Sequence, residues 1–351
     1  MPPSHSNRIV WVDVCRILCM YCVLVQHSIF LPDGYHTPWH GIIMGMAYDF
    51  TRPILPVLVF FFFSGWLQKS SSKYMEWKKP LFLYAPAILF WNVVQLLIQP
   101  GPISNWTNAV HQLGVFPFSC NANGPLWFLQ ELMFFTLFLP LILRIPVHFR
   151  LVIVICCLWV GNSYYSLDGW GITTYSNDIA FFLAGTTLQG INKEAIYSFL
   201  RKTAVWFVPF TVYIILGVLL PEPFTFHPTN NVKFNGLSPV IGFLSMCGFS
   251  ILLTIVFPKL SLLISSCSAA IFFLYASHWP LFTLYNRIAS AFDIPPPHPH
   301  LYPLTLVAFI ILGTIVWKAA SKTNCKWLLS IVFMQAPSKP KPENPTEQQA
   351  S

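Results

Sequence analysis

The sequence of residues 10–30 is VWVDVCRILCMYCVLVQHSIF. This stretch has 21 residues and only two charged side chains, Asp13 and Arg16. A helix that crosses the hydrocarbon of a bilayer needs about 20 mostly apolar residues. The stretch is too long and too polar for a cleaved signal peptide, whose apolar region has roughly 7 to 15 residues. We therefore expect residues 10–30 to form a first membrane span.

The rest of the chain repeats this apolar pattern. Of its 351 residues, 55% are hydrophobic and 9% are charged, whereas an ordinary soluble domain has about 25% charged residues. This composition excludes a soluble enzyme, because one core surrounded by water cannot bury so much apolar surface. The pattern predicts an all-α, polytopic membrane helical bundle of about ten transmembrane helices. They lie near residues 10–30, 50–67, 81–98, 126–143, 151–167, 177–190, 204–220, 237–257, 263–285 and 301–317.

Lys and Arg residues predict the orientation of this bundle, because they concentrate in short cytoplasmic loops. Alternate connections carry Arg8; Lys69, Lys73, Lys78 and Lys79; Arg144 and Arg150; Lys193, Arg201 and Lys202; Lys259; and Lys318, Lys322 and Lys326. The intervening loops hold only Lys233 and the borderline Arg287. We expect both termini to be cytoplasmic and the membrane to be a plasma membrane or a bacterial inner membrane. Because the basic residues are spread over loops, the net charge of +8 does not indicate nucleic-acid binding.

One transmembrane domain is expected over residues 1–333. Residues 334–351 end in QAPSKPKPENPTEQQAS, which is Pro-rich and polar. Such a segment has too few apolar side chains to form a core, so we expect a disordered cytoplasmic tail.

The nine cysteines fall mostly inside apolar spans and indicate no disulfide framework. Cys15, Cys19 and Cys22 follow helical spacing, which is compatible with a metal site. The sequence has no matching His or Cys cluster to complete four ligands, and packing of small residues between membrane helices explains the spacing better. We expect no metal and no bound cofactor.

Ionisable residues inside the spans are costly and are candidates for function. They are Asp13, Arg16, His27, Arg52, Glu131, Asp178 and His278. Any one of them alone is as compatible with a structural hydrogen bond between helices as with function. In the predicted orientation, however, all of them except Asp13 and Arg16 lie in the outer half of the membrane. Clustering at one depth favours a functional site.

Arg16 and His27 are eleven residues apart, which at about 100° per residue is three turns plus roughly 20°. Both therefore lie on one helix face, with an axial separation of about 16 Å. Asp13 lies one turn from Arg16 and is expected to pair with it. A buried histidine near carboxylates and arginine fits general acid/base catalysis or a proton relay in a transporter. Pro53 and Pro56 keep the transporter hypothesis open, because broken helices are typical of carriers.

Four stretches, in this order along the chain, resemble motifs of the integral-membrane acyltransferases grouped as acyltransferase family 3. The first is the pattern of Arg16, ten residues and His27, preceded by Asp13. The others are RPILPVLVFFFFSGWL, with Arg52, Pro56, Ser64 and Gly65; GPLWFLQEL, with Trp127 and Phe128; and FFLYASHWPLF, with Tyr275, His278 and Pro280. The ordered set covers about residues 8–318 and is more specific than any of its parts.

This resemblance implies transfer of an acyl group, expected to be acetyl, from cytoplasmic acyl-CoA to a hydroxyl of a carbohydrate or glycolipid. Asp13 and Arg16 would bind the donor, with the planar guanidinium on a CoA phosphate. The expected catalytic group is His27 as general base with Glu131 and His278, and the expected oxyanion or acceptor group is Arg52, Trp127 and Tyr275. The competing hypothesis is a carrier or flippase that moves a sugar or lipid without acyl transfer.

Overall fold

A computed structural model describes residues 9–28, 56–67, 78–99, 113, 122–161, 172–203, 238–294, 302–322 and 330–332. In these residues the secondary structure is helical and no strand occurs. The α-helices are α1 (Val10–Ser28), α3 (Pro56–Leu67), α4 (Lys78–Ile98), α6 (Trp127–Ile142), α7 (Val147–Gly161), α8 (Ile172–Thr187), α9 (Lys193–Thr203), α12 (Ser238–Val256), α13 (Pro258–Ser265), α14 (Ile271–Ala291) and α15 (Tyr302–Ala320). Two short 3₁₀ helices, η4 (Gly124–Leu126) and η5 (Ser268–Ala270), precede α6 and α14. The predicted all-α class is confirmed for this part of the chain.

Most predicted spans correspond to helices with ends within a few residues of those expected. The predicted seventh span (204–220), the tail (334–351) and Arg52 lie outside the described residues. The short helix α9 is an addition, because its residues were expected to form a loop. It begins after Asn192, whose side-chain oxygen accepts a hydrogen bond from the backbone N–H of Glu194 at 2.9 Å, as is typical of a helix N-terminus.

The predicted ninth span (263–285) is corrected by the structure. A corner divides this region into α13, η5 and α14, and α14 extends to Ala291. At the corner the Ser266 hydroxyl donates to the carbonyl of Leu263 at 2.7 Å, and the N–H of Cys267 makes a tight-turn bond to Ile264 at 3.0 Å. Serine side chains compete with helical hydrogen bonds in this way. The corner residues are small and uncharged, so hydropathy alone does not reveal the break.

The chain is a multi-pass membrane protein. Among the described residues, four helical segments are long and apolar enough to cross a membrane: Pro80–Ile98, Gly124–Ile142, Pro258–Ala291, which includes the corner, and Pro303–Ala320. Large apolar side chains on outer helices are exposed, such as Leu97 at 78% and Trp159 at 76%. Contiguous apolar exposure of this kind suits contact with lipid rather than water.

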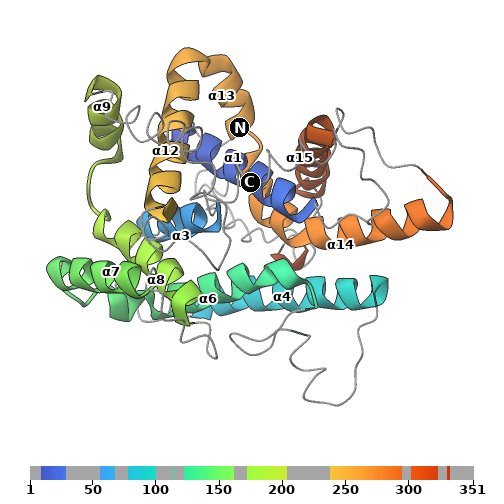
Figure 1. Cartoon of the computed structure of the whole chain (residues 1–351), viewed down its shortest axis with the longest axis horizontal. Helices are drawn as coiled ribbons and strands as arrows, with labels where there is room; N and C mark the ends of the chain where they lie inside the picture. The colour runs from blue at the N-terminus through green and yellow to red at the C-terminus, as the bar shows by residue number, and fades with distance from the viewer. Residues whose placement is uncertain are drawn as a thin grey trace, which may run out of the picture.

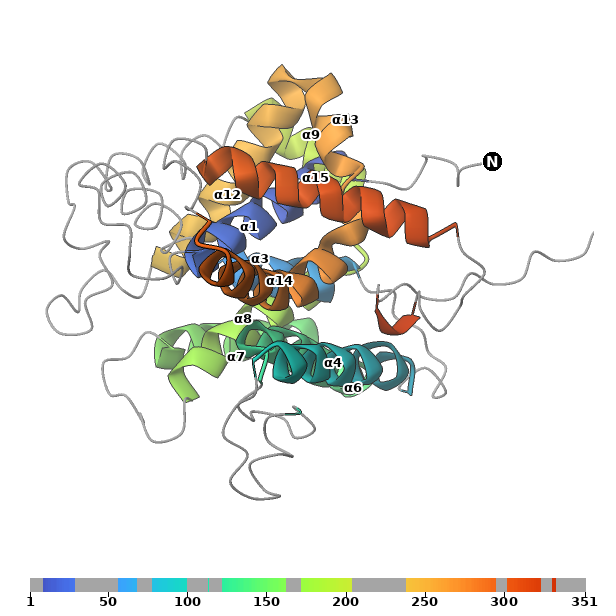
Figure 2. The same cartoon turned by 90° about the vertical axis from the view of Figure 1, so that its right-hand side faces the viewer.

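Helix α1 lies inside the bundle (Figures 1 and 2). It contacts α3, α12, α13, α14 and α15, and its side chains from Trp11 to Cys15 are buried. Because neighbouring helices surround α1, its two charged residues are shielded from lipid, where a charge is expensive. The first turns of α1 lie beside the end of α13 and the start of α14. Its last turn lies beside α14.

Two glycines allow α3 and α8 to cross closely. A Cβ atom on Gly65 would collide with the backbone carbonyl oxygen of Phe182, and one on Gly185 would collide with that of Phe62. Small residues at membrane helix contacts permit this approach of two backbones. The side chain of Gln189 reinforces the crossing by donating to the carbonyl of Gly65 at 2.6 Å.

Candidate active site

Asp13 and Arg16 form a polar contact in the first turns of α1. Arg16 Nη1 lies 4.0 Å from Asp13 Oδ1, and the Ser265 hydroxyl at the end of α13 donates to Asp13 Oδ2 at 2.9 Å. The Arg16 guanidinium carbon lies 5.8 Å from the centre of the Phe272 ring, which is within the range of a cation–π contact. The expected pairing of Asp13 with Arg16 is therefore present, and the ends of α13 and α14 hold it in place.

At the other end of α1, His27 meets His278 of α14. His27 Nδ1 lies 2.8 Å from His278 Nε2, and the two rings stack with centroids 4.9 Å apart. The Trp279 ring contacts His27 edge-on at 5.7 Å. His278 is completely buried, whereas His27 keeps partial exposure. The two histidines therefore form a stacked, hydrogen-bonded pair.

The hydrogen bonds of His278 indicate which ring nitrogens carry protons. Its Nδ1 lies 2.6 Å from the backbone carbonyl oxygen of Tyr275. A carbonyl only accepts hydrogen bonds, so the hydrogen-bond network assigns the proton of a neutral His278 to Nδ1. Nε2 of His278 is then an acceptor, and the Nδ1–H of His27 donates to it. The lone pair of a neutral His27 is consequently on Nε2, which is the kind of atom that a general base uses.

A proline in α14 changes the hydrogen bonding next to this pair. Pro280 lies inside the helix and has no N–H, so the carbonyl of Ala276, four residues earlier, loses its helical partner. Nδ2 of the buried Asn123 donates to that carbonyl at 2.9 Å. The backbone N–H of Asn123 in turn donates to Oδ1 of Asn92 at 2.9 Å. The two amide side chains therefore connect α4 and the start of η4 to α14 close to His278.

The side chain of Tyr275, itself part of one sequence motif, contacts residues of two others. Its hydroxyl donates to the backbone carbonyl of Pro125 at 2.8 Å. Its ring lies 4.9 Å from that of Phe128 and 6.4 Å from that of Phe60, measured between centroids. Aromatic pairs at these separations stabilise the packing of helices. Tyr275 thereby positions the backbone carbonyl that holds His278.

Glu131 of α6 faces Asp178 of α8. Both side chains are buried, at 2% and 3% exposure, and each carboxyl group lies in the electrostatic neighbourhood of the other. Both carboxyl groups are also electrostatic neighbours of Tyr275. The sequence hypothesis grouped Glu131 and His278 with His27, and of these two His278 is in direct contact with His27.

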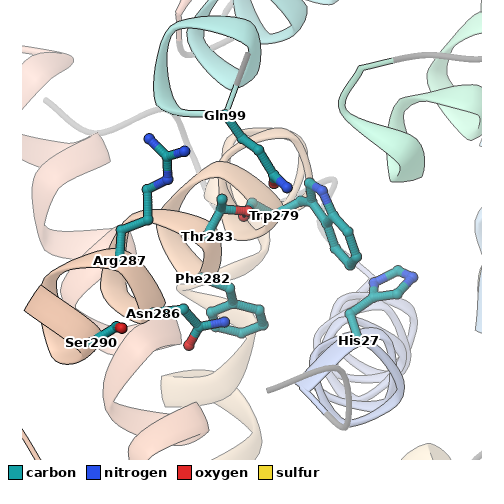
Figure 3. A pocket seen from close by; sticks show the side chains of 8 residues that line it. All are labelled: His27, Gln99, Trp279, Phe282, Thr283, Asn286, Arg287 and Ser290. Carbon is teal, nitrogen blue, oxygen red and sulfur yellow. The ribbon is translucent and has the colours of Figure 1, made fainter. Parts of the chain in front are cut away.

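An open pocket of about 400 Å³ lies beside the histidine pair. It is lined by His27, by Gln99 just after α4, and by six residues of the second half of α14, from Trp279 to Ser290. Figure 3 shows His27 next to Trp279, with Asn286, Arg287 and Ser290 farther along α14. A volume in the range of roughly 300 to 1,000 Å³ is typical of small-molecule sites. His27 therefore has access to a space that can hold a substrate.

The structure joins some of the predicted site residues and separates others. His27 and His278 are in direct contact, while Trp127 packs against Phe61 with centroids 6.5 Å apart and does not line the pocket. Arg52 lies outside the described residues. Of the residues that line the pocket, only His27 was among the predicted site residues. Sequence reasoning missed the others, which are Gln99, Trp279, Phe282, Thr283, Asn286, Arg287 and Ser290, and the linking residues Asn92 and Asn123. The available signal was the spacing of Thr283, Asn286 and Ser290, three or four residues apart in an apolar helix.

Comparison with known protein families gives one match. The family described as "Acyltransferase domain" matches residues 9–318. This range extends from the residue before α1 almost to the end of α15 and so includes Asp13, Arg16, the histidine pair and the pocket. No curated protein and no solved structure matches the chain.

Proposed function

The chain belongs to the acyltransferase 3 family, and we propose that it transfers an acetyl group from acetyl-CoA to a hydroxyl of a carbohydrate or glycolipid. Membership of the family implies a membrane acyltransferase, and the proposal adds the donor and the class of acceptor. The observation that carries it is the histidine pair beside an open pocket. Transfer of an acyl group to a hydroxyl uses such a base, with its lone pair directed at the acceptor, next to a substrate-sized space.

The proposed reaction is a direct transfer. The acceptor hydroxyl oxygen attacks the thioester carbonyl carbon and forms a C–O bond, while Nε2 of His27 takes the hydroxyl proton. The C–S bond then breaks, and the departing thiolate takes the proton from the His27 imidazolium and leaves as CoA. The acceptor nitrogen of His278, 2.8 Å from Nδ1 of His27, stabilises the imidazolium while it exists.

The donor is assigned to the other end of α1. Arg16 is one-fifth exposed, and its guanidinium suits a CoA phosphate because it offers several donors in one plane. Asp13, Ser265 and Phe272 keep this guanidinium in place. Eleven residues of helix separate Arg16 from His27, about 16 Å, which is comparable to the length of an extended pantetheine arm.

The roles of the other predicted residues follow from their positions. His278 is proposed to orient His27. Tyr275 is proposed to act through the carbonyl that holds His278, because its own hydroxyl is bonded to Pro125. Arg52 stays a candidate for the oxyanion, since acyl transfer needs a donor aimed at the developing negative charge. The membrane is proposed to be a plasma membrane or a bacterial inner membrane, with donor and acceptor on opposite sides.

The test uses the full-length protein, purified in nanodiscs, with labelled acetyl-CoA and a glycan extract from the membranes that contain it. We expect label to appear in an ester bond on the extract. His27→Gln, which keeps a hydrogen bond but cannot take the proton, should lose roughly 10²- to 10⁴-fold in rate. Arg16→Lys keeps the charge and loses the planar fork, so it should weaken acetyl-CoA binding.

Arg144→Lys is the matched control for Arg16, because Arg144 is exposed at the end of α6, and it should leave acetyl-CoA binding unchanged. Full activity in His27→Gln would rule out its role as the base. Unchanged acetyl-CoA affinity in a folded Arg16→Ala protein would remove the donor role of Arg16. Movement of the glycan across the bilayer without any ester formation would favour the carrier hypothesis.

A further inference from the structure

The second half of α14 presents a polar stripe to the pocket. Thr283, Asn286, Arg287 and Ser290 all line it, and their spacing of three and four residues places them on one helix face. The surrounding residues of the same helix are apolar and exposed, including Leu281, Leu284 and Ile288. The four polar residues give this face of α14 the groups with which a polar ligand can bond.

The chemistry of the lining matches a carbohydrate. Asn286, Gln99 and the Ser290 hydroxyl supply both donors and acceptors. The Thr283 hydroxyl donates to the carbonyl of Trp279 at 2.9 Å and accepts from Gln95 at 3.3 Å. The rings of Trp279 and Phe282 supply flat apolar surfaces (Figure 3), on which the C–H faces of a sugar ring can pack. A pocket with few aromatic rings and several convergent polar groups is typical of sites that fix the orientation of a ligand.

The described residues of the pocket lining carry a positive charge. Among the described residues that line the pocket, Arg287 is the single cation and none is Asp or Glu. Arg287 is exposed rather than buried in the bundle, so its guanidinium can reach a ligand. An anionic group on the ligand would therefore find a planar set of donors.

The position of Arg287 gives the place of this anionic group on the ligand. Arg287 follows His278 by nine residues, about 14 Å along the helix. The pocket from Trp279 to Ser290 extends over eleven residues, about 16 Å, which is longer than one sugar ring. An anion at Arg287 and a hydroxyl at His27 can therefore belong to neighbouring units of one glycan.

We infer that this pocket binds an acidic acceptor, a glycan whose anionic group contacts Arg287 while a hydroxyl on a neighbouring unit reaches Nε2 of His27. This inference rests on the proposed function and extends it to the class of acceptor. The anionic group is the carboxylate of an acidic sugar or the phosphodiester of a lipid-linked glycan, since both offer oxygens to the guanidinium in the same way.

The experiment compares pairs of ligands that differ by one anionic group. Cellobiose is paired with cellobiouronic acid, and butyl glucoside with glucosyl butyl phosphate. Dissociation constants are measured by saturation-transfer NMR titration with the full-length protein in nanodiscs, without acetyl-CoA. The variants are Arg287→Gln, which keeps hydrogen bonding without charge, and Lys318→Gln, a control that removes an exposed cation from α15.

We expect at least one anionic ligand to bind about tenfold more tightly than its neutral partner, the lower range for a charge-assisted hydrogen bond. The pair that shows the preference identifies the source of the anion. Arg287→Gln should abolish the preference and leave the neutral ligands and acetyl-CoA unaffected, and Lys318→Gln should retain it. Equal affinity within both pairs would overturn the inference, as would a loss of acetyl-CoA binding alone in Arg287→Gln, which would assign Arg287 to the donor.

Measuring glycan binding and acetyl transfer on the same protein distinguishes a failure of this inference from a failure of the proposed function. Arg287-dependent binding of an acidic glycan with no acetyl transfer would contradict the proposed function and the acceptor role with it, while it would support the preference of the pocket for an anionic glycan. Acetyl transfer that depends on His27 but shows no preference for acidic glycans would support the proposed function and overturn the inference.

Discussion

Replacement of His278 by phenylalanine separates a positioning role from a catalytic one. Phenylalanine keeps a ring among Tyr275 and Phe282, whose centroids lie 5.6 and 5.9 Å from that of His278, but it cannot accept a hydrogen bond from His27. Loss of one neutral hydrogen bond costs about 0.5–1.5 kcal/mol. If the lost hydrogen bond raises the free energy of the reactive orientation of His27 by this amount, kcat/KM falls by about 2- to 13-fold. Removal of the base in His27→Ala should cost roughly 10²- to 10⁴-fold.

The assay for the histidine pair measures acetyl transfer from labelled acetyl-CoA, acetyl-CoA affinity and melting temperature on the same preparations. His278→Gln offers an oxygen that can accept from Nδ1 of His27, so it should recover part of the loss seen in His278→Phe. His148→Phe, at an exposed histidine of α7, is the matched control and should leave transfer unchanged. A loss in His278→Phe as large as that in His27→Ala, at an unchanged melting temperature, would refute the positioning role. Full activity in His278→Phe would refute it as well.

Three further predictions concern the fold. Gly185→Ala places a methyl group against the backbone of α3 and should lower stability by about 1–3 kcal/mol, whereas Gly124→Ala, whose Cβ meets nothing within 4 Å, should not; equal melting temperatures would contradict the close crossing. Asn123→Leu leaves a buried carbonyl of α14 without its donor and should cost about 1–3 kcal/mol, and a thermal unfolding curve like that of the wild type would show that the bond contributes nothing. Cysteines introduced at Tyr74 and Gln112 should be labelled from the cytoplasmic and the outer side respectively, and labelling of both from one side would exclude the predicted orientation.

Local features of the fold could be predicted from the sequence because they depend on one segment at a time. A helix that is long and apolar enough to cross a membrane is recognised from the hydropathy of its own residues, as for α4 and α15. The Asp13–Arg16 contact follows from the geometry of a single helix, in which residues one turn apart are neighbours. The shared face of Arg16 and His27 follows from the same periodicity.

Local reasoning failed where polar side chains act on the backbone. The residues from Ser266 to Ser268 are small and uncharged, so their hydropathy continues the neighbouring spans. Only the hydrogen bond of the Ser266 hydroxyl to Leu263 and the tight turn of Cys267 reveal the corner. Pro280 was recognised as part of a motif, but its consequence, a free carbonyl that Asn123 satisfies, depends on a residue from a distant segment.

The partner of His27 was decided by tertiary structure alone. Sequence and orientation place His278, Glu131 and Asp178 at a similar depth in the membrane, but depth does not determine which helix lies beside α1. That choice depends on packing between helices: the crossing of α3 and α8 at Gly65 and Gly185 and the aromatic contacts of Tyr275. These contacts hold α8 and α14 against α3 and hold α14 against α6, while α1 contacts both α3 and α14. His27 therefore meets His278, and Glu131 lies near Asp178. Hydropathy and helical period describe one helix at a time, whereas the neighbours of each helix follow from the shapes of all the side chains between them.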